Sequence, residues 1–279
     1  LIRGAVRNVP GEDYYLTELK GAVRFSHVDF SYVPGKRILH DVSVYANPGQ
    51  KIAFVGSTGA GKTTICKAIM GLLGNAYRAD GEILFQGEDL LDLAERERQI
   101  IYGKEICMIM QNPMTAFNPS IRVGRQMEKT YLLHHGKTPR QEMQRLFAAI
   151  LQKLGLEDTQ RILNSYPFTL SGGMLQRLMI AAALMCQPSL LVADEATTAI
   201  DACNRIGLMR ELKSFCKEGM SVLFVTHDLR SASVSDRILV MDCGQIVEQG
   251  TTEQILNAPK EDYTKYLLNA CRLERREMS

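Results

Sequence analysis

A nine-residue glycine-rich segment, Gly56–Thr64, constrains this 279-residue chain more than any other feature. It fits the pattern G-x-x-x-x-G-K-[ST], follows the apolar run 51–55 and opens a helical pattern over 63–73, and this setting separates it from a chance glycine-rich turn. Glycines let backbone N–H groups surround a polyphosphate, and a helix N-terminus adds a favourable field. We expect Lys62 to neutralise the β- and γ-phosphates and the Thr63 hydroxyl to ligate Mg²⁺. The expected phosphate-binding residues are Gly56, Ser57, Thr58, Gly59, Ala60, Gly61, Lys62, Thr63 and Thr64.

A second pair of motifs indicates the class of nucleotide-binding protein. Residues 170–177 read Leu-Ser-Gly-Gly-Met-Leu-Gln-Arg at the head of an apolar helical pattern, and the apolar run 189–193 leads into Asp194-Glu195. With the glycine-rich loop, these motifs resemble the ATP-binding-cassette (ABC) ATPases, over about residues 21–270. The resemblance implies ATP and Mg²⁺ as cofactors, a second ATPase subunit in a head-to-tail dimer, and transmembrane permease subunits as partners.

Composition is consistent with a packed globular protein and argues against several other classes. The net charge of +2 and the isoelectric point near 8.2 lack the basic excess typical of nucleic-acid proteins, so no nucleic acid partner is expected. Seven scattered cysteines without C-x-x-C spacing indicate reduced thiols in a cytosolic protein. The longest apolar run, 178–186, is too short to cross a membrane. The expected location is cytoplasmic, peripheral on the inner face of the cell membrane.

The pattern of apolar residues predicts an α/β fold, and the resemblance specifies a P-loop NTPase of the ABC ATPase type. We expect a parallel core sheet, an antiparallel β subdomain and an inserted helical subdomain. Within the helical region, Thr138-Pro139-Arg140-Gln141 predicts a helix start with Thr138 as N-cap, and Gly155 predicts its end. The expected strands are 22–32, 37–46, 81–86, 105–110, 189–193, 221–226, 236–242 and 245–249. The expected divisions are a linker or remnant of a longer polypeptide at 1–20 and an ATPase domain at 21–279, with its core at 21–111 and 188–250, a helical subdomain at 112–187 and a helical tail at 251–279.

The two carboxylates that follow the run 189–193 are candidates for metal binding and catalysis. The resemblance implies that Asp194 orients Mg²⁺ and that Glu195 polarises the attacking water as general base. Adjacent side chains on a strand point to opposite faces, but at a strand end both can reach one site. A structural salt bridge is the alternative role for Glu195.

The resemblance implies two further polar residues at strand ends. Gln111 follows the strand pattern 106–110 and would contact Mg²⁺ and the attacking water. His227 follows the pattern 221–226 and would bond the γ-phosphate and hold the geometry of the water. A lone histidine at a strand end is often structural, which is the alternative role for His227.

Three more segments take their expected roles from the resemblance. Tyr32 would stack on adenine, or would instead cover a strand edge. Ser171, Gly172 and Gly173 would complete the nucleotide site of the opposite subunit, through a hydroxyl, free N–H groups and a positive helix terminus. Asp201 would either cap the following helix or cross the same interface.

Two branches of the family are recognisable within the chain. Residues 21–61 resemble an exporter cassette, whereas the chain from about Cys66 onward resembles the nickel, dipeptide and oligopeptide importer ATPases, most specifically in the run 110–119. An engineered fusion with its seam in or just after the phosphate loop, or natural divergence, explains the mixture. The peptide branch of the resembled family often has a cysteine-rich C-terminal extension, but here only Cys271 lies in that region, so no iron–sulfur cluster is expected.

The predicted function is ATP hydrolysis that powers import of a solute of the nickel or peptide type. Three alternatives remain open at the level of the sequence. The chain could be the excised nucleotide-binding domain of an exporter, a non-transport ABC clamp, or a nucleotide-binding regulatory module without turnover. Adjacent histidines, His134-His135, do not face one site on a helix, and they predict a solvent-facing pair rather than a nickel site.

Overall fold

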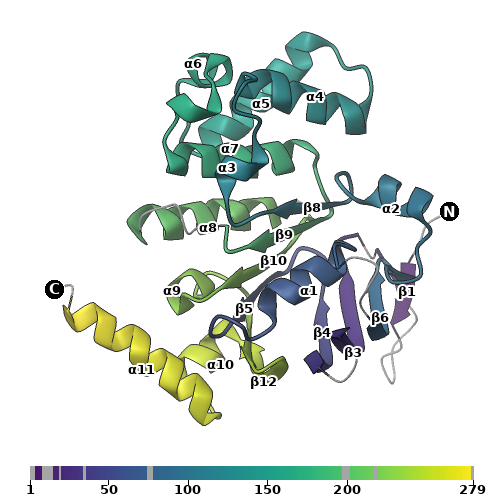
Figure 1. Ribbon diagram of the computed structural model, residues 1–279, viewed down its shortest axis with the longest axis vertical. Helices are drawn as coiled ribbons and strands as arrows, with labels where there is room; N and C mark the ends of the chain where they lie inside the picture. Colours follow the sequence, from purple (N-terminus) through teal and green to yellow (C-terminus); the bar gives the residue numbers. More distant parts are fainter. Residues whose placement is uncertain are drawn as a thin grey trace.

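The molecule is known from a computed structural model, which describes residues 4–7, 15–18, 20–33, 36–73, 78–196, 202–216 and 219–277. Two sheets and their helices form one end of the molecule, and a group of helices forms the other (Figure 1). The strands are β1 (Gly4–Arg7), β2 (Tyr15–Glu18), β3 (Val23–Val33), β4 (Lys36–Ala46), β5 (Lys51–Val55), β6 (Arg78–Phe85), β7 (Glu88–Asp89), β8 (Ile106–Ile109), β9 (Leu190–Asp194), β10 (Ser221–Thr226), β11 (Arg237–Asp242) and β12 (Gln245–Thr251). The helices are α1 (Lys62–Ile69), α2 (Glu95–Ile101), α3 (Pro113–Ala116), α4 (Val123–His135), α5 (Arg140–Lys153), α6 (Thr159–Asn164), the 3-10 turn η1 (Pro167–Thr169), α7 (Gly172–Met185), α8 (Ala202–Cys216), α9 (Leu229–Ala232), α10 (Thr252–Asn257) and α11 (Asp262–Glu277).

The larger sheet has six strands in the order β12-β11-β5-β10-β9-β8. All neighbours are parallel except β12, which pairs antiparallel with β11. Every residue of β5, β9 and β10 is buried, which explains why these strands appear in the sequence as continuous apolar runs. The predicted parallel core is therefore confirmed.

The smaller sheet is antiparallel, in the order β4-β3-β6-β7. Its long strands β3 and β4 alternate between buried and exposed residues along much of their length, so that Phe25, Phe30 and Leu39 face inward. These side chains share one apolar cluster with Phe54 of β5 and Ile65 of α1. The cluster holds the start of α1 against both sheets and so fixes the segment between β5 and α1.

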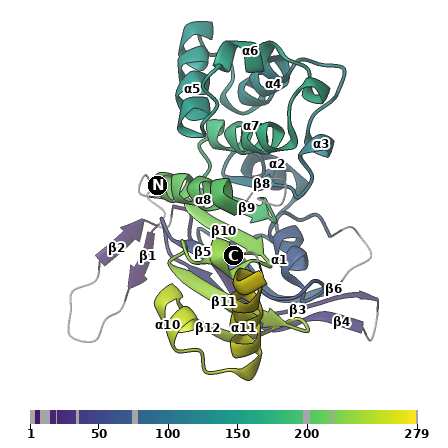
Figure 2. The same ribbon diagram turned by 90° about the vertical axis from the view of Figure 1, so that its left-hand side faces the viewer.

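Helices α3 to α7 lie together at one end of the molecule, on the side of β8 (Figures 1 and 2). Buried side chains of α4, α5 and α7 join the core that also contains one face of the larger sheet. The expected N-cap of α5 is wrong. The cap residue is Pro139 without a side-chain bond, because the Thr138 hydroxyl instead donates to the carbonyl of Gly136, at 3.4 Å. Gly155, at φ +70°, does follow the end of that helix as expected.

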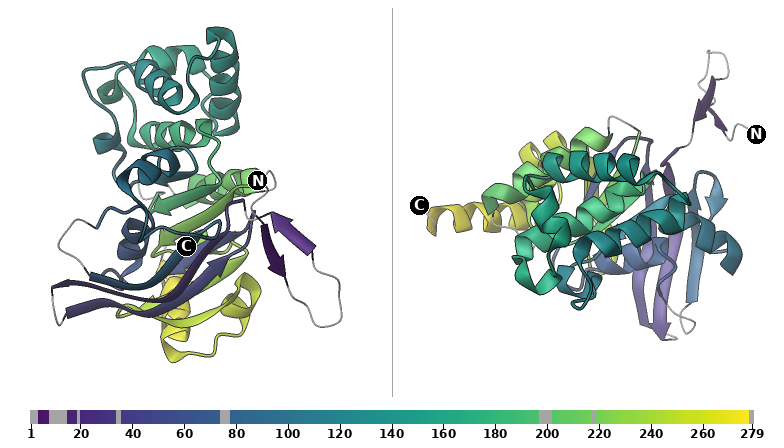
Figure 3. Two further views of the ribbon diagram at one scale, coloured as in Figure 1. Left: turned by 90° about the vertical axis from the view of Figure 1, so that its right-hand side faces the viewer. Right: turned by 90° about the horizontal axis from the view of Figure 1, so that it is seen from above.

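The two ends of the chain carry additional elements. In the segment expected to be a linker, β1 and β2 form a separate antiparallel pair, which projects from the body on a different side from the C-terminal end of α11 (Figure 3). The tail contains α10 and α11, as its pattern predicted. Within the described ranges, no helix has both the length and the apolar character needed to cross a membrane.

Candidate nucleotide-binding site

The glycine-rich loop connects the end of β5 to the first turn of α1. Gly61 is the N-cap of α1 with φ +92°, and a Cβ there would lie 2.8 Å from a methyl carbon of Leu39. A Cβ on Gly56 would collide with the carbonyl oxygen of Met241. Glycine is therefore required at Gly61 by backbone conformation and by space, and at Gly56 by space alone. The result is a loop whose amides can approach a phosphate closely.

Lys62 lies inside this loop with only 5% of its surface exposed. Its Nζ donates hydrogen bonds to the carbonyl oxygens of Gly56 and Ser57, at 2.8 and 2.6 Å. Burial is the main reason that the pKa of Lys62 lies below its usual value, and the carboxylates of Glu195 and Asp194 act in the opposite direction. An anionic ligand at the loop would compensate the cost of burying this cation.

Thr63 and Asp194 form a pair of oxygen ligands beside the loop. The Thr63 hydroxyl donates to Oδ1 of Asp194 at 3.0 Å, and Asp194 is 7% exposed at the end of β9. Burial raises the pKa of Asp194, while the bond from Thr63 acts in the opposite direction. A hydroxyl and a largely buried carboxylate side by side fit a hard cation such as Mg²⁺, which prefers oxygen ligands and usually shares them with substrate phosphates.

Glu195 is the centre of a second polar group at the same edge of the sheet. Gln111, just beyond β8, donates from Nε2 to Oε2 of Glu195 at 2.8 Å. His227, just beyond β10, places Nδ1 3.4 Å from Oε1 of Glu195. Since β8, β9 and β10 are parallel neighbours, their carboxyl ends meet at one edge, where ligands bind in open α/β sheets.

The structure therefore brings together residues that lie as far apart in the sequence as Lys62 and His227. Lys62 and Thr63 adjoin Asp194, and Glu195 joins Gln111 to His227. Such an arrangement can neutralise phosphate charge and accept a proton from a water molecule.

The serine–glycine motif lies elsewhere in the same chain. Ser171 is the N-cap of α7 and its Oγ accepts a hydrogen bond from the backbone N–H of Met174 at 3.3 Å. Ser171 and Gly172 are exposed, and no hydrogen bond or ion pair given for the described residues joins them to the phosphate loop. The side chain of Tyr32 and the whole of Asp201 lie outside the described residues, so the roles expected for them stay predictions.

Tyr263 is a residue of the site that the sequence did not indicate. Its hydroxyl accepts a hydrogen bond from the backbone N–H of Ser57 at 3.1 Å, across a sequence separation of 206 residues. No local pattern marks this tyrosine, because the contact depends on how α11 packs beside the loop.

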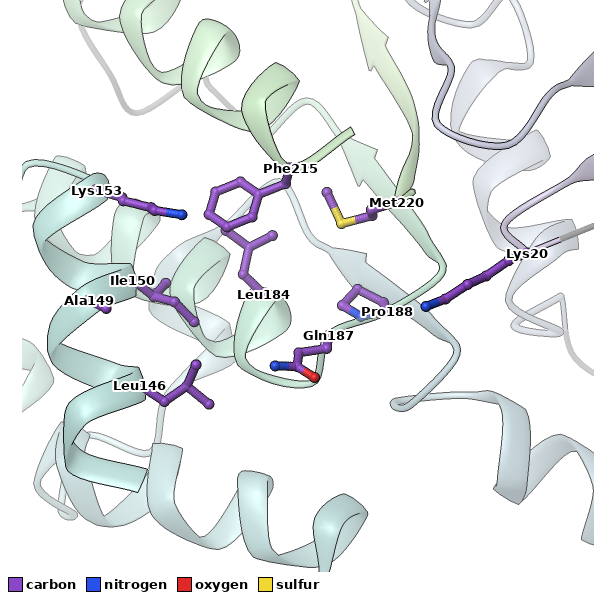
Figure 4. A pocket seen from close by; sticks show the side chains of 10 residues that line it. All are labelled: Lys20, Leu146, Ala149, Ile150, Lys153, Leu184, Gln187, Pro188, Phe215 and Met220. Carbon is purple, nitrogen blue, oxygen red and sulfur yellow. The ribbon is translucent and has the colours of Figure 1, made fainter. Parts of the chain in front are cut away.

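A cavity of about 350 Å³ lies apart from these residues (Figure 4). It is formed by α5 and α8, the end of α7, and the segments that lead into β3, β9 and β10. Its lining residues are Lys20, Leu146, Ala149, Ile150, Lys153, Leu184, Gln187, Pro188, Phe215 and Met220. None of the candidate site residues contributes to it, so the candidate site is a set of surface loops rather than this cavity.

Comparison with known proteins decides the family. The pattern described as "ABC transporter" matches residues 39–198, more than half of the chain, and includes the phosphate loop, the serine–glycine motif and the Asp194-Glu195 pair. The chain belongs to the ABC transporter family. It is an ATPase of that family, with the fold that the sequence predicted.

Curated ABC proteins of import systems are among its relatives. The chain is 40% identical to the metal-staphylopine import system ATP-binding protein CntD of Staphylococcus aureus (strain Mu50) over 234 residues, which cover 83% of this chain and 86% of that protein. It is 38% identical to the dipeptide transport ATP-binding protein DppD of Lactococcus lactis over 252 residues, covering 89% and 72%. A solved dimer of the ATP-binding cassette MJ0796 with ADP and Pi is similar at a TM-score of 0.73 and 25% identity, covering 82% and 98%.

The proposed seam near residue 66 finds no support in these ABC matches. From residue 66 to the end the chain has 214 residues, whereas the match to the staphylopine import protein extends over 234. Similarity to an importer ATPase therefore reaches into the part that was compared with exporters.

Proposed function

We propose that the chain hydrolyses Mg-ATP as the nucleotide-binding subunit of an ABC importer for a peptide or a metal-containing solute. The observation that carries this proposal is the group of Glu195, Gln111 and His227 beside the Thr63–Asp194 pair, at one edge of the sheet. A carboxylate bonded to an amide and an imidazole suits a general base whose position must be held. The names of the relatives, which specify metal-staphylopine and dipeptide systems, support the solute class.

Each residue has a defined task in the proposed reaction. The amides of the phosphate loop and the Nζ of Lys62 bind and neutralise the phosphates, and Thr63 and Asp194 would hold Mg²⁺ with Gln111. Mg²⁺, when bound, neutralises charge on the β- and γ-phosphates. Glu195 accepts a proton from the water that attacks the γ-phosphate, while Gln111 and His227 hold the carboxylate in place. Tyr32 is proposed to stack on adenine.

A second ATPase subunit is proposed to complete the site. Ser171 caps α7, whose first residues are Gly172 and Gly173, and free N–H groups and a hydroxyl can meet an anion there. Within one chain they are not joined to the phosphate loop by a described contact. A head-to-tail dimer would bring them to the γ-phosphate held by the partner, and the dimeric cassette with ADP and Pi is consistent with this arrangement.

Permease subunits are the proposed membrane partners, with the chain on the cytoplasmic face. Exposed apolar side chains lie close along the chain to Gln111 and to the start of α7, among them Met110, Met114 and Phe168, at 51%, 53% and 66%. Such side chains suit burial against another protein.

We propose that 112–187 acts as a helical subdomain inserted into a core of 21–111 and 188–250, followed by the tail 251–279. An exporter cassette is the second candidate, and neither an iron–sulfur cluster nor nucleic acid has a part in either proposal.

Phosphate release from Mg-ATP by the purified chain tests the proposed activity. We expect turnover that requires Mg²⁺ and is lost on chelation, and no turnover by Lys62→Ala. A chain that binds ATP but releases no phosphate, even with its native membrane partners added, would instead support a regulatory module. Co-purification from its native membrane, with mass spectrometry of the permease, identifies the transporter and separates import from export.

A further inference from the structure

We infer that Tyr263 is a positioning residue for the phosphate loop, which acts by holding the peptide unit between Gly56 and Ser57. The hydroxyl of Tyr263, in the first turn of α11, accepts a hydrogen bond from Ser57 N at 3.1 Å. This role deepens the proposed ATPase function and rests on it. It assigns to the C-terminal tail a direct effect on nucleotide affinity.

The peptide unit in question has contacts on both of its sides. Its carbonyl belongs to Gly56 and accepts a hydrogen bond from Lys62 Nζ at 2.8 Å, while its N–H belongs to Ser57 and donates to Tyr263. Because a peptide unit is planar, fixing the direction of its N–H also fixes the direction of its carbonyl oxygen. Tyr263 therefore sets the orientation of the group that holds the phosphate-binding lysine.

The position of Tyr263 is itself well defined. The carboxylate of Glu248, on β12, accepts hydrogen bonds from the backbone N–H groups of Lys260 and Glu261, at 2.8 and 3.1 Å. These bonds fix the chain immediately before α11, where unpaired N–H groups would otherwise remain. In the helix, Thr264 is fully buried and Leu268 is 8% exposed. The start of α11 is thus attached both to the sheet and to the core, and the tyrosine hydroxyl cannot easily leave the loop.

The same helix also contacts the segment that follows His227. That segment begins α9, where Asp228 is the N-cap and accepts a bond from the N–H of Arg230 at 2.9 Å. An Arg230 guanidinium nitrogen donates to the carbonyl oxygen of Cys271 in α11 at 3.4 Å. One tail helix therefore adjoins both the phosphate loop and the helix next to the candidate catalytic histidine.

Loss of the tyrosine hydroxyl has a predictable consequence for binding. Both partners of this hydrogen bond belong to the protein itself, so the bond helps to hold the loop in a form ready for phosphate. Removing one such bond should weaken ATP binding by about 2- to 10-fold. Because a preformed loop binds substrate and transition state alike, KM should rise by that factor while kcat changes little.

The test uses Tyr263→Phe in the full chain, with Tyr266→Phe as control. Phenylalanine keeps the ring and its packing, and Tyr266 lies on the same helix at 67% exposure. ATP affinity is measured in EDTA, where hydrolysis does not occur, and KM and kcat are measured with Mg²⁺. The melting temperature without nucleotide reports on packing. We expect weaker ATP binding and a higher KM only in Tyr263→Phe, with unchanged nucleotide-free melting.

Unchanged affinity in Tyr263→Phe, an equal loss in Tyr266→Phe, or a parallel fall in nucleotide-free melting would overturn the inference. A double-mutant cycle then checks the partner. Ser57→Pro removes the N–H group, so Tyr263→Phe should have almost no added effect in that background. A full additional loss of ATP affinity from Tyr263→Phe in the Ser57→Pro background would also count against the inference. Absence of ATP binding by the wild-type chain would refute the proposed function itself, so the two failures are distinguishable.

Discussion

At the scale of single residues, the backbone of Glu195 explains how two adjacent carboxylates serve one site. Its φ is +48°, in the left-handed region that non-glycine residues rarely adopt. The strand β9 ends at Asp194, and the unusual φ ends the alternation that would send the next side chain to the opposite face. Sparsely populated conformations of this kind are often found at functional sites. Asp194 can thus face Thr63 while Glu195 faces Gln111 and His227.

Glu195→Gln is expected to retain ATP binding and to lose most turnover. The change preserves size but removes the proton acceptor, and the loss of a general base typically costs about 10²–10⁴-fold. Phosphate release is measured at saturating Mg-ATP, and binding is measured in the same preparation. Glu157→Gln, at an exposed loop position, is the matched control and should be fully active. Wild-type turnover by Glu195→Gln would remove this residue from the mechanism.

Tyr32→Ala tests a role that the sequence alone predicts. Stacking of a base on an aromatic ring is worth about 1–3 kcal/mol, so ATP affinity should fall by that amount. Inorganic triphosphate, which has no base, should bind both chains equally. If both ligands weaken together, Tyr32 supports the fold rather than adenine.

At the scale of secondary-structure elements, Lys51 of β5 places an ionisable amine in the contact with α8. Its side chain is fully buried, its Nζ donates to the carbonyl oxygen of Met209 at 2.5 Å, and it lies 5.2 Å from the centre of the Phe224 ring. Burial lowers the pKa of Lys51 to about 7, with smaller effects from Cys216, Lys213 and Asp236. The ammonium form is therefore less favourable in the folded protein than in the unfolded chain.

This shift predicts a pH dependence of stability. Between pH 7 and about 10.4, the lysine of the unfolded chain binds a proton that the folded protein does not, so the free energy of unfolding rises with pH. The contribution of the neutral Lys51 amine to the free energy of unfolding is complete above the pKa that this lysine has in the unfolded chain. It is lost as the pH falls through about 7, the pKa in the folded protein. Relative to Lys51→Met, the wild-type protein should gain on the order of 1 kcal/mol per pH unit. Urea unfolding of both chains at pH 7.5, 8.5 and 9.5 checks this, and parallel pH profiles would contradict it.

How far the sequence predicted these elements depends on where their stabilising contacts lie. The strands β5, β9 and β10 were predictable, since burial on both faces favours continuous runs of apolar side chains. The start of α5 was predicted one residue early because Thr138 bonds a carbonyl of the preceding turn rather than the helix. The β1–β2 pair had no signal in its mixed polar sequence.

The candidate site shows the same division between local and distant determinants. Loop and strand-end residues such as Lys62 and Glu195 stand in short motifs whose chemistry requires those residue types. Tyr263 does not, because its partner Ser57 is 206 residues away and only the packing of α11 brings them together.

At the scale of the whole molecule, there are two arrangements to distinguish: Ser171 completes the nucleotide site of the opposite chain, or it completes the site of its own chain. In the proposed dimer, the serine of one chain completes the phosphate loop of the other. We expect a heterodimer of a Lys62→Ala chain and a Ser171→Arg chain to recover ATPase activity that neither homodimer has. One composite site then carries both lesions, and the other carries neither. If Ser171 served its own chain, every site would contain a lesion and no activity would return.

Two different affinity tags, one on each chain, allow the heterodimers to be purified free of homodimers before activity is measured. The crossed control joins a wild-type chain to a Lys62→Ala/Ser171→Arg chain, and its expected result is the reverse. In the proposed arrangement each of its sites contains one lesion, so it should be inactive, whereas a site built within one chain would stay intact in the wild-type subunit. ATP binding to both heterodimers is measured alongside phosphate release, because two intact sites can be required for turnover. Tight ATP binding by the first heterodimer but not the crossed one would then still support completion of each site by the opposite subunit, and the reverse pattern would refute it.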